Sequence, residues 1–206
     1  MRKVLLVLLV AMLAVLPSIA QSAGADKESG STAMPKIGFD FNALGILIDD
    51  FSGSAEMAFT PNISGKVYIE YSPNLVWISD ISVLGLQLEG RYYFSDLIHG
   101  TPSFLKGKAI KGLFGGVGLG FYSLNWNYSG IGYTGSYFAP DFFLEVGTKY
   151  MLGQHWYLDG ALGYDIVFSG TWTWKDSSGN TIESFTATPT ELPGGLRYTL
   201  TIGYAL

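Results

Sequence analysis

The side chains that could do chemistry in this chain are two histidines and two pairs of carboxylates. General acid–base work needs a partner held within hydrogen-bond reach, and we expect His99 and His155 to be turn residues without that role. Asp49-Asp50 and the pair Asp159 and Asp165 could bind Ca²⁺ or protons, although isolated acid pairs are usually turn or interior residues. Without a positioned histidine no acyl-transfer group forms, and no metal-ligand spacing appears. We therefore expect no enzyme and no cofactor.

The elements that position these residues are predicted to be long strands, because the stretch 137–170 alternates two residues at a time. Its apolar face consists of Phe142, Leu144, Val146, Tyr150, Trp156, Leu158, Leu162, Tyr164, Ile166 and Phe168. Its polar face carries Asp141, Glu145, Lys149, Asp159 and Asp165. The pattern predicts a hairpin that turns at 152–154, with arms of about 14 residues. A tilted strand needs roughly 9–11 residues to cross a bilayer, so these arms are long enough for a membrane wall.

Composition narrows the class of protein. The chain has 206 residues, and its charged residues amount to 14%, against about 25% in typical soluble domains. The absence of Cys excludes disulfides, Cys-ligated metals and a lipid anchor on an N-terminal Cys. Without Arg2 and Lys3 the chain keeps 10 basic and 17 acidic residues, a net charge of −7, which argues against a nucleic-acid partner.

Three segments are expected along the chain. Residues 1–20 read as a signal peptide cleaved near Ala20, with basic residues first, an apolar run over 4–16 and a small-x-small site at 18–20. That run is short of the roughly 20 residues that a spanning helix needs. Residues 21–35 read as a flexible N-terminal lead-in, and residues 36–206 as the barrel domain.

The fold predicted for 36–206 is all-β, an eight-stranded antiparallel up-and-down transmembrane β-barrel with its first strand beside its last. The expected strands lie near 36–42, 55–60, 66–71, 84–94, 110–127, the two arms of 137–170, and 196–206. The phase is unclear near 43–45, 49–54 reads as a polar turn, and 95–109 as an irregular connection that can hold a helical turn. In the fifth strand, Gly116, Gly118 and Gly120 share a face, and on an inner wall they would leave room for bulky neighbours.

Charge decides which face is outside. The polar faces of the expected strands carry Asp40, Glu56, Lys66, Glu70, Glu89, Arg91, Glu145, Lys149, Asp159, Asp165 and Arg197, and the apolar faces carry no charge. This mixture of signs predicts a polar network of ion pairs that fills a narrow lumen. Flanking aromatics favour two membrane interfaces, and these are Tyr71, Tyr92, Phe94, Tyr150, Trp156 and Tyr198.

The last strand alternates Tyr198, Leu200, Ile202, Tyr204 and Leu206. With GGVGLGFYS at 115–123 and VGTKYMLGQHWYLDGALGYD at 146–165, the chain resembles small eight-stranded outer-membrane proteins of Gram-negative-type bacteria, the outer membrane protein β-barrel domain family, OmpW/OmpX-like. Members usually end in Phe or Trp, whereas this chain ends in Leu. The resemblance implies the cell outer membrane, contact with outer-membrane lipid, and recognition of the C-terminal strand by the barrel assembly machinery. Some related barrels carry a His-based site at the outer rim, while His99 and His155 fall at the expected periplasmic end.

The expected function is non-enzymatic. Eight strands enclose little more than their own side chains, so we expect no porin-like conductance. The long links 73–82, 128–136 and 171–193 are expected to be outer loops, with Trp172 and Trp174 as possible loop contacts for an extracellular ligand. A structural or surface-interaction protein is therefore predicted. Two alternatives stay open, an OmpW-like narrow channel for small apolar solutes and a secreted soluble ligand-binding β-barrel.

Overall fold

The computed structural model describes residues 37–42, 51–73, 80–99, 102, 110–128, 132–187 and 195–206. The predicted signal peptide, the lead-in, the unclear phase at 43–45 and the pair Asp49-Asp50 lie outside the described residues. No helix within the described ranges is long and apolar enough to cross a membrane.

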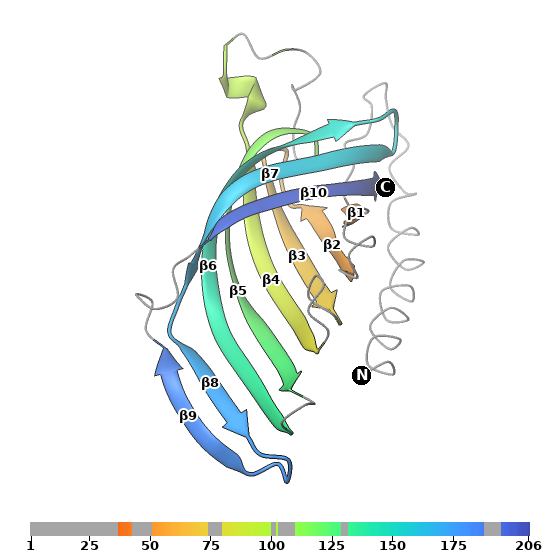
Figure 1. Cartoon of the computed structure of the whole chain (residues 1–206). Helices are drawn as coiled ribbons and strands as arrows, with labels where there is room; N and C mark the ends of the chain where they lie inside the picture. The colour runs from red at the N-terminus through yellow and green to blue at the C-terminus, as the bar shows by residue number, and fades with distance from the viewer. Residues whose placement is uncertain are drawn as a thin grey trace. The chain divides into compact units, whose positions relative to one another are not determined.

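The described chain consists almost entirely of strands (Figure 1). They are β1 (Ile37–Phe41), β2 (Phe51–Ala58), β3 (Ile63–Ser72), β4 (Ile81–Tyr93), β5 (Gly112–Tyr128), β6 (Tyr133–Met151), β7 (Trp156–Val167), β8 (Gly170–Lys175), β9 (Thr181–Ala187) and β10 (Leu196–Ala205). A single 3₁₀ turn, η2 (Ser95–Leu97), follows β4 in the part of the 95–109 connection that is described.

Eight of these strands close into a barrel by antiparallel pairing. Going round, the order is β1, β2, β3, β4, β5, β6, β7 and β10, and the ring closes where β10 pairs with β1. In that closing pair Phe41 lies opposite Ile202. The predicted eight-stranded antiparallel up-and-down barrel is therefore confirmed.

The prediction of a loop at 171–193 is wrong for much of its length, because β8 and β9 form a hairpin there. β8 pairs with the first part of β6, from Thr134 to Phe138, and extends past the end of β7 (Figure 1). Between β7 and β8 the amide of Phe168 donates to the carbonyl of Pro140 at 3.0 Å. Proline has no amide hydrogen to return that bond, so the ladder is interrupted where β7 gives way to β8.

Two other boundaries also differ from the prediction. β5 and β6 continue through most of 128–136, and β2 begins at Phe51 inside the expected polar turn.

The short turns 59–62 and 152–155 lie at the same end of the barrel as Ile37 and Ala205. We call this the turn end, and the opposite end, where β8 and β9 project, the loop end.

Candidate functional site

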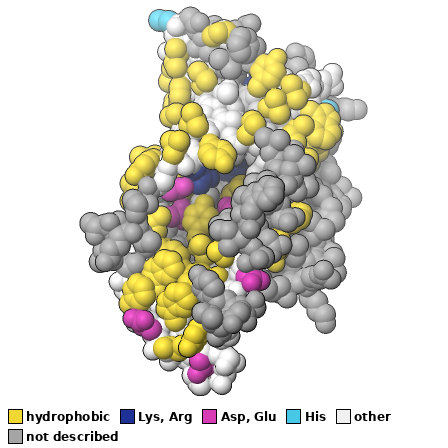
Figure 2. Space-filling view, in the orientation of Figure 1, with side chains coloured by type: hydrophobic (Ala, Val, Ile, Leu, Met, Phe, Trp, Pro, Cys, Tyr) yellow, Lys and Arg dark blue, Asp and Glu magenta, His cyan; other side chains and the backbone are white. Residues whose placement is uncertain are grey.

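The inward side chains of the barrel meet in a network of ion pairs. Alternation directs every second residue into the lumen, and the register places Lys66 between Glu56 and Glu89 on three adjacent strands. Nine of the ten predicted lumen residues belong to linked ion pairs among the described side chains, namely Glu56, Lys66, Glu89, Arg91, Glu145, Lys149, Asp159, Asp165 and Arg197. Asp40 joins them through Lys66 at 3.3 Å. Figure 2 shows Lys, Arg, Asp and Glu side chains together near the centre of the view.

Arg91 lies at the centre of this lumen network. Its Nη1 lies 2.6 Å from Asp159, its Nη2 2.9 Å from Glu145, and its Nε 2.7 Å from Glu89. A fourth acid, Glu56, lies 3.5 Å from Nη1. Because a guanidinium has a rigid fork of donors, one side chain links strands on opposite sides of the barrel.

Two lysines complete the middle of the network. Lys149 and Asp159 have no exposed surface, and Lys149 forms an ion pair with Glu56 and lies 3.6 Å from Asp159. Lys66 reaches Asp159 at 3.0 Å. An unpaired charge in such a place would cost several kcal/mol, roughly, so the pairing is what makes the burial of these groups tolerable.

Aromatic and hydroxyl groups that the sequence did not single out support the charges. The Tyr93 hydroxyl donates to Glu56 at 2.6 Å, and the Tyr157 hydroxyl donates to Asp40 at 3.3 Å. The Arg91 guanidinium stacks 3.9 Å above the Phe114 ring. Alternation alone puts these aromatics on the polar face, but nothing in the sequence indicates which charge each one contacts.

The glycines of β5 make room for this filling. A Cβ at Gly116 would meet the carboxylate of Glu89, and one at Gly118 would overlap the Phe143 ring. A larger side chain from a neighbouring strand therefore occupies the space that a side chain at each glycine would need. This agrees with the expectation that these glycines lie on the inner wall and leave room for bulky neighbours.

Glu70 is the tenth predicted lumen residue, and it lies nearer the loop end. It lines a small cavity of about 180 Å³ together with Tyr68, Tyr122, Asp165 and Arg197. Arg197 pairs with Glu145 at 3.0 Å and Asp165 at 3.5 Å, so this cavity borders the ion pairs directly.

The outer face of the barrel is apolar. Val146 is 63% exposed and Leu162 60%, values that would be unusual for so many neighbouring apolar side chains on a soluble protein. The exposed aromatics at the turn end include Phe59, Tyr92, Tyr150, Trp156 and Tyr204. Tyr71, Phe41, Phe51 and Phe138 lie toward the other end.

The polarity of the outer face reverses at the loop end. One row of directly paired residues crosses four strands as Ser82, Asn125, Ser136 and Thr173. The next row outward contains Asn127, Thr134 and Lys175. Paired residues share a face of the sheet, so these two rows form a polar zone on the same side as the apolar rows below it.

The inner face reverses in the opposite sense. Above the lumen network, consecutive inward rows hold Val83, Leu124, Tyr137, Trp172 and Phe185, and then Ile81, Trp126, Gly135 and Trp174. The Trp126 ring lies 5.0 Å from that of Trp172 and 5.4 Å from that of Trp174. Trp172 and Trp174 are thus half-buried strand residues packed on an aromatic cluster, and their role as ligand contacts stays a prediction.

Neither His99 nor His155 belongs to the ion pairs of the lumen, and Asp159 and Asp165 both do. His155 is exposed at the turn end, where its Nδ1 lies 3.0 Å from the carbonyl of Ala205, and its ring stacks on Tyr204 at 5.2 Å. His99 is exposed just after η2. Asp159 pairs with cations and Asp165 with Arg197, and the described residues include no cluster of acids or histidines able to hold a metal ion.

Together these features define a class: a closed β-barrel that is apolar outside, charged inside and reversed in polarity at one end. No family model matches the chain, and no curated protein matches its sequence. Among solved structures it is similar to a major outer membrane protein from Thermus thermophilus, with a TM-score of 0.51 and 16% identity over 84% of this chain and 100% of that one. This likeness shows a shared fold. The OmpW/OmpX-like assignment stays a prediction.

Proposed function

We propose that the chain is a non-enzymatic integral outer-membrane β-barrel with a filled lumen, acting as a structural or surface-interaction protein. The observation that supports this proposal most strongly is the polarity of the outer face, which is apolar along the barrel and polar at the loop end. A barrel in lipid needs this arrangement, because its outer surface meets hydrocarbon and then water. The soluble alternative needs an apolar interior, whereas here the interior holds the ion pairs.

The lumen network supports a closed barrel. Arg91 and Lys149 are buried side chains that connect separate walls of the barrel, Arg91 through Asp159 and Lys149 through Glu56. An ion that crossed would have to displace these pairs, so no steady conductance is expected. Any function then belongs to the outer wall or the projecting end, and outer-membrane lipid is the first expected partner. Assembly through β10 and cleavage near Ala20 remain predictions.

Membrane fractionation combined with planar-bilayer recording tests this proposal. The protein should stay in the membrane fraction after a carbonate wash, need detergent for extraction, and migrate as a heat-modifiable band on a gel. In planar bilayers it should give no large, steady channels. Release by carbonate would contradict membrane insertion, and steady channels would contradict a closed lumen.

A second candidate is entry of small apolar solutes at the loop end. The aromatic cluster of Trp126, Tyr137 and Trp172 favours it, because an apolar inner face stands above the lumen network. If an apolar solute docks there, it should quench tryptophan fluorescence in the wild type and lose affinity in Trp172→Ala. Unchanged fluorescence at saturating solute would exclude this candidate.

A further inference from the structure

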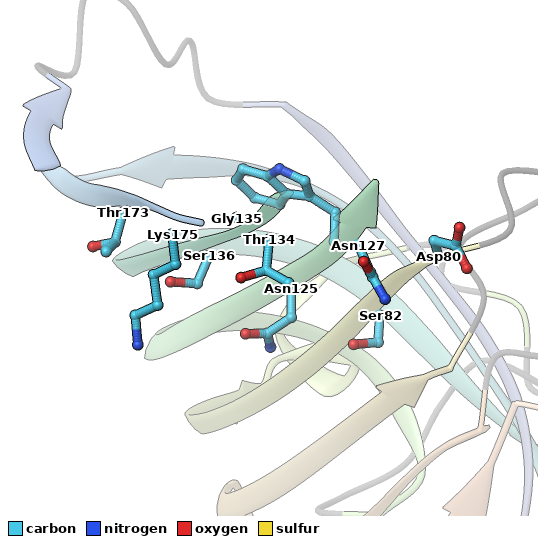
Figure 3. Close-up of a pocket in the computed structure, with 10 residues that line it drawn as sticks. Asp80, Ser82, Asn125, Asn127, Thr134, Gly135, Ser136, Thr173 and Lys175 are labelled. Carbon is cyan, nitrogen blue, oxygen red and sulfur yellow. The ribbon is translucent and has the colours of Figure 1, made fainter. Parts of the chain in front are cut away.

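A pocket of about 350 Å³ lies on the outer face at the loop end (Figure 3). It is lined by parts of β4, β5, β6 and β8, with Asp80 at its edge. Figure 3 shows Ser82, Asn125, Ser136 and Thr173 in successive positions across neighbouring strands. Its volume is at the lower end of the roughly 300–1,000 Å³ that ligand pockets occupy.

The chemistry of the lining points to a neutral, polyhydroxylated group. Its side chains are mainly hydroxyls and carboxamides, with Lys175 as the cation and Asp80 as the carboxylate. Amides and hydroxyls both donate and accept hydrogen bonds, as does a sugar ring. Asp80 has a φ of +96°, a strained value for a residue other than glycine, and its carbonyl accepts from the Asn127 amide at 2.9 Å.

The position of the pocket points to a lipid rather than a free sugar. Along the same outward faces the next rows include Leu84 and Phe138, and then Leu86 and Phe121. The first of these rows also holds Ser123 and Thr171, but Leu84 is 42% exposed and Phe138 50%, so exposed apolar side chains begin in the row next to the polar pocket. One amphiphile can therefore place its head in the pocket and its chains along these rows.

We propose that this pocket binds the sugar headgroup of a glycolipid, with the acyl chains of the same molecule on the apolar rows below. This inference rests on the proposed membrane orientation and goes beyond it by assigning a ligand class to a defined site. The hydroxyl and amide rows recognise the head, and the apolar wall adds affinity through the chains.

Native mass spectrometry of the full-length protein in an amine-oxide detergent, which has no sugar of its own, tests this site. The probes are digalactosyl diacylglycerol, phosphatidylcholine with the same chains, and the free galactose disaccharide. The glycolipid should bind at least about tenfold more tightly than either other probe. Asn125→Ala combined with Ser136→Ala should weaken it about tenfold, the effect of losing two hydrogen bonds.

Gln154→Ala is the control, because this exposed carboxamide lies in the 152–155 turn at the turn end and does not line the pocket. It should bind the glycolipid like the wild type, and each variant should keep its heat-modifiable band. Equal binding of phosphatidylcholine, equal binding of the free disaccharide, or no effect of the pocket variant would each overturn this inference in an intact barrel. A wild-type protein that folds without detergent would overturn the membrane proposal as well.

Discussion

At the scale of single residues, Arg91 is the side chain on which the lumen depends most. Its substitution by Met would remove the cation that four acids share and leave them facing one another. Breaking such a buried network typically costs about 3–5 kcal/mol. We expect Arg91→Met to lower the free energy of unfolding in detergent by about that amount, which is measured as a lower urea midpoint. Arg197→Met, which loses two acids and is partly exposed, should cost less; equal midpoints for the wild type and Arg91→Met would contradict the pairing.

Gly118 gives a second test at this scale. An added methyl group would overlap the Phe143 ring and the carbonyl of Leu88, so Gly118→Ala should destabilise the barrel by about 1–3 kcal/mol. Gly90→Ala is the matched control, since a Cβ there meets only the Val117 carbonyl at 4.0 Å. Unfolding followed by tryptophan fluorescence measures both. Equal stability of the two variants would show that the lumen is looser than the packing around Gly118 indicates.

Sequence alone could assign these charges to one face, because alternation fixes which residues share a face, and the charges then mark that face as the inner one. It could not say which charges meet. Lys66 and Asp159 are 93 positions apart, and their contact depends on the way the whole ring closes. The same holds for Tyr93 and Tyr157, whose hydroxyls complete the network from strands distant in sequence.

At the scale of elements, the β8–β9 hairpin is where sequence reasoning failed. Thr171, Trp172, Thr173 and Trp174 do alternate, but their polar members face outward, opposite to the phase of the eight barrel strands. Because polar residues stand where the barrel strands have apolar ones, the sequence alone predicts a loop for this segment. The polar zone could not be predicted either, because Ser82, Asn125 and Thr173 come from separate strands and only the register aligns them.

The turn of this hairpin should respond to pH through Asp176. Its carboxylate accepts the backbone amide of Asn180 at 2.8 Å and that of Ser178 at 2.9 Å. These bonds, led by that of Asn180, hold the pKa of Asp176 below its usual value. A carboxyl whose folded pKa is lowered stabilises the turn above its ordinary pKa and loses this effect as pH falls through the lowered value.

Amide hydrogen exchange at Asn180 measures this effect. Protection should be constant at neutral pH and fall below about pH 4, the ordinary range for aspartate, once intrinsic exchange rates are corrected for. Asp176→Asn keeps a side-chain oxygen but does not titrate, so its protection should not change over the same interval. A wild-type protein whose protection is equally independent of pH would contradict the role of the carboxylate.

At the scale of the whole molecule, the chain combines a closed ring of eight strands with two reversals of polarity. Alternation and strand length predicted the ring, because both are local properties of the sequence. The two reversals occur at the same height of the barrel. At that height the outward side chains change from apolar to polar, and the inward side chains change from charged to aromatic. This level is the expected outer boundary of the membrane.

The most direct test of the account is a nitroxide scan along the outward face of β6. The chain has no Cys, so single substitutions at Thr134, Ser136, Phe138, Leu144 and Val146 place one label each without disturbing the lumen. In lipid vesicles, labels at 144 and 146 should be relaxed by oxygen and shielded from a polar nickel reagent. Labels at 134 and 136 should show the reverse, with the change near 138. Access of the nickel reagent to 144 and 146 equal to that at 134 would contradict a membrane-embedded wall.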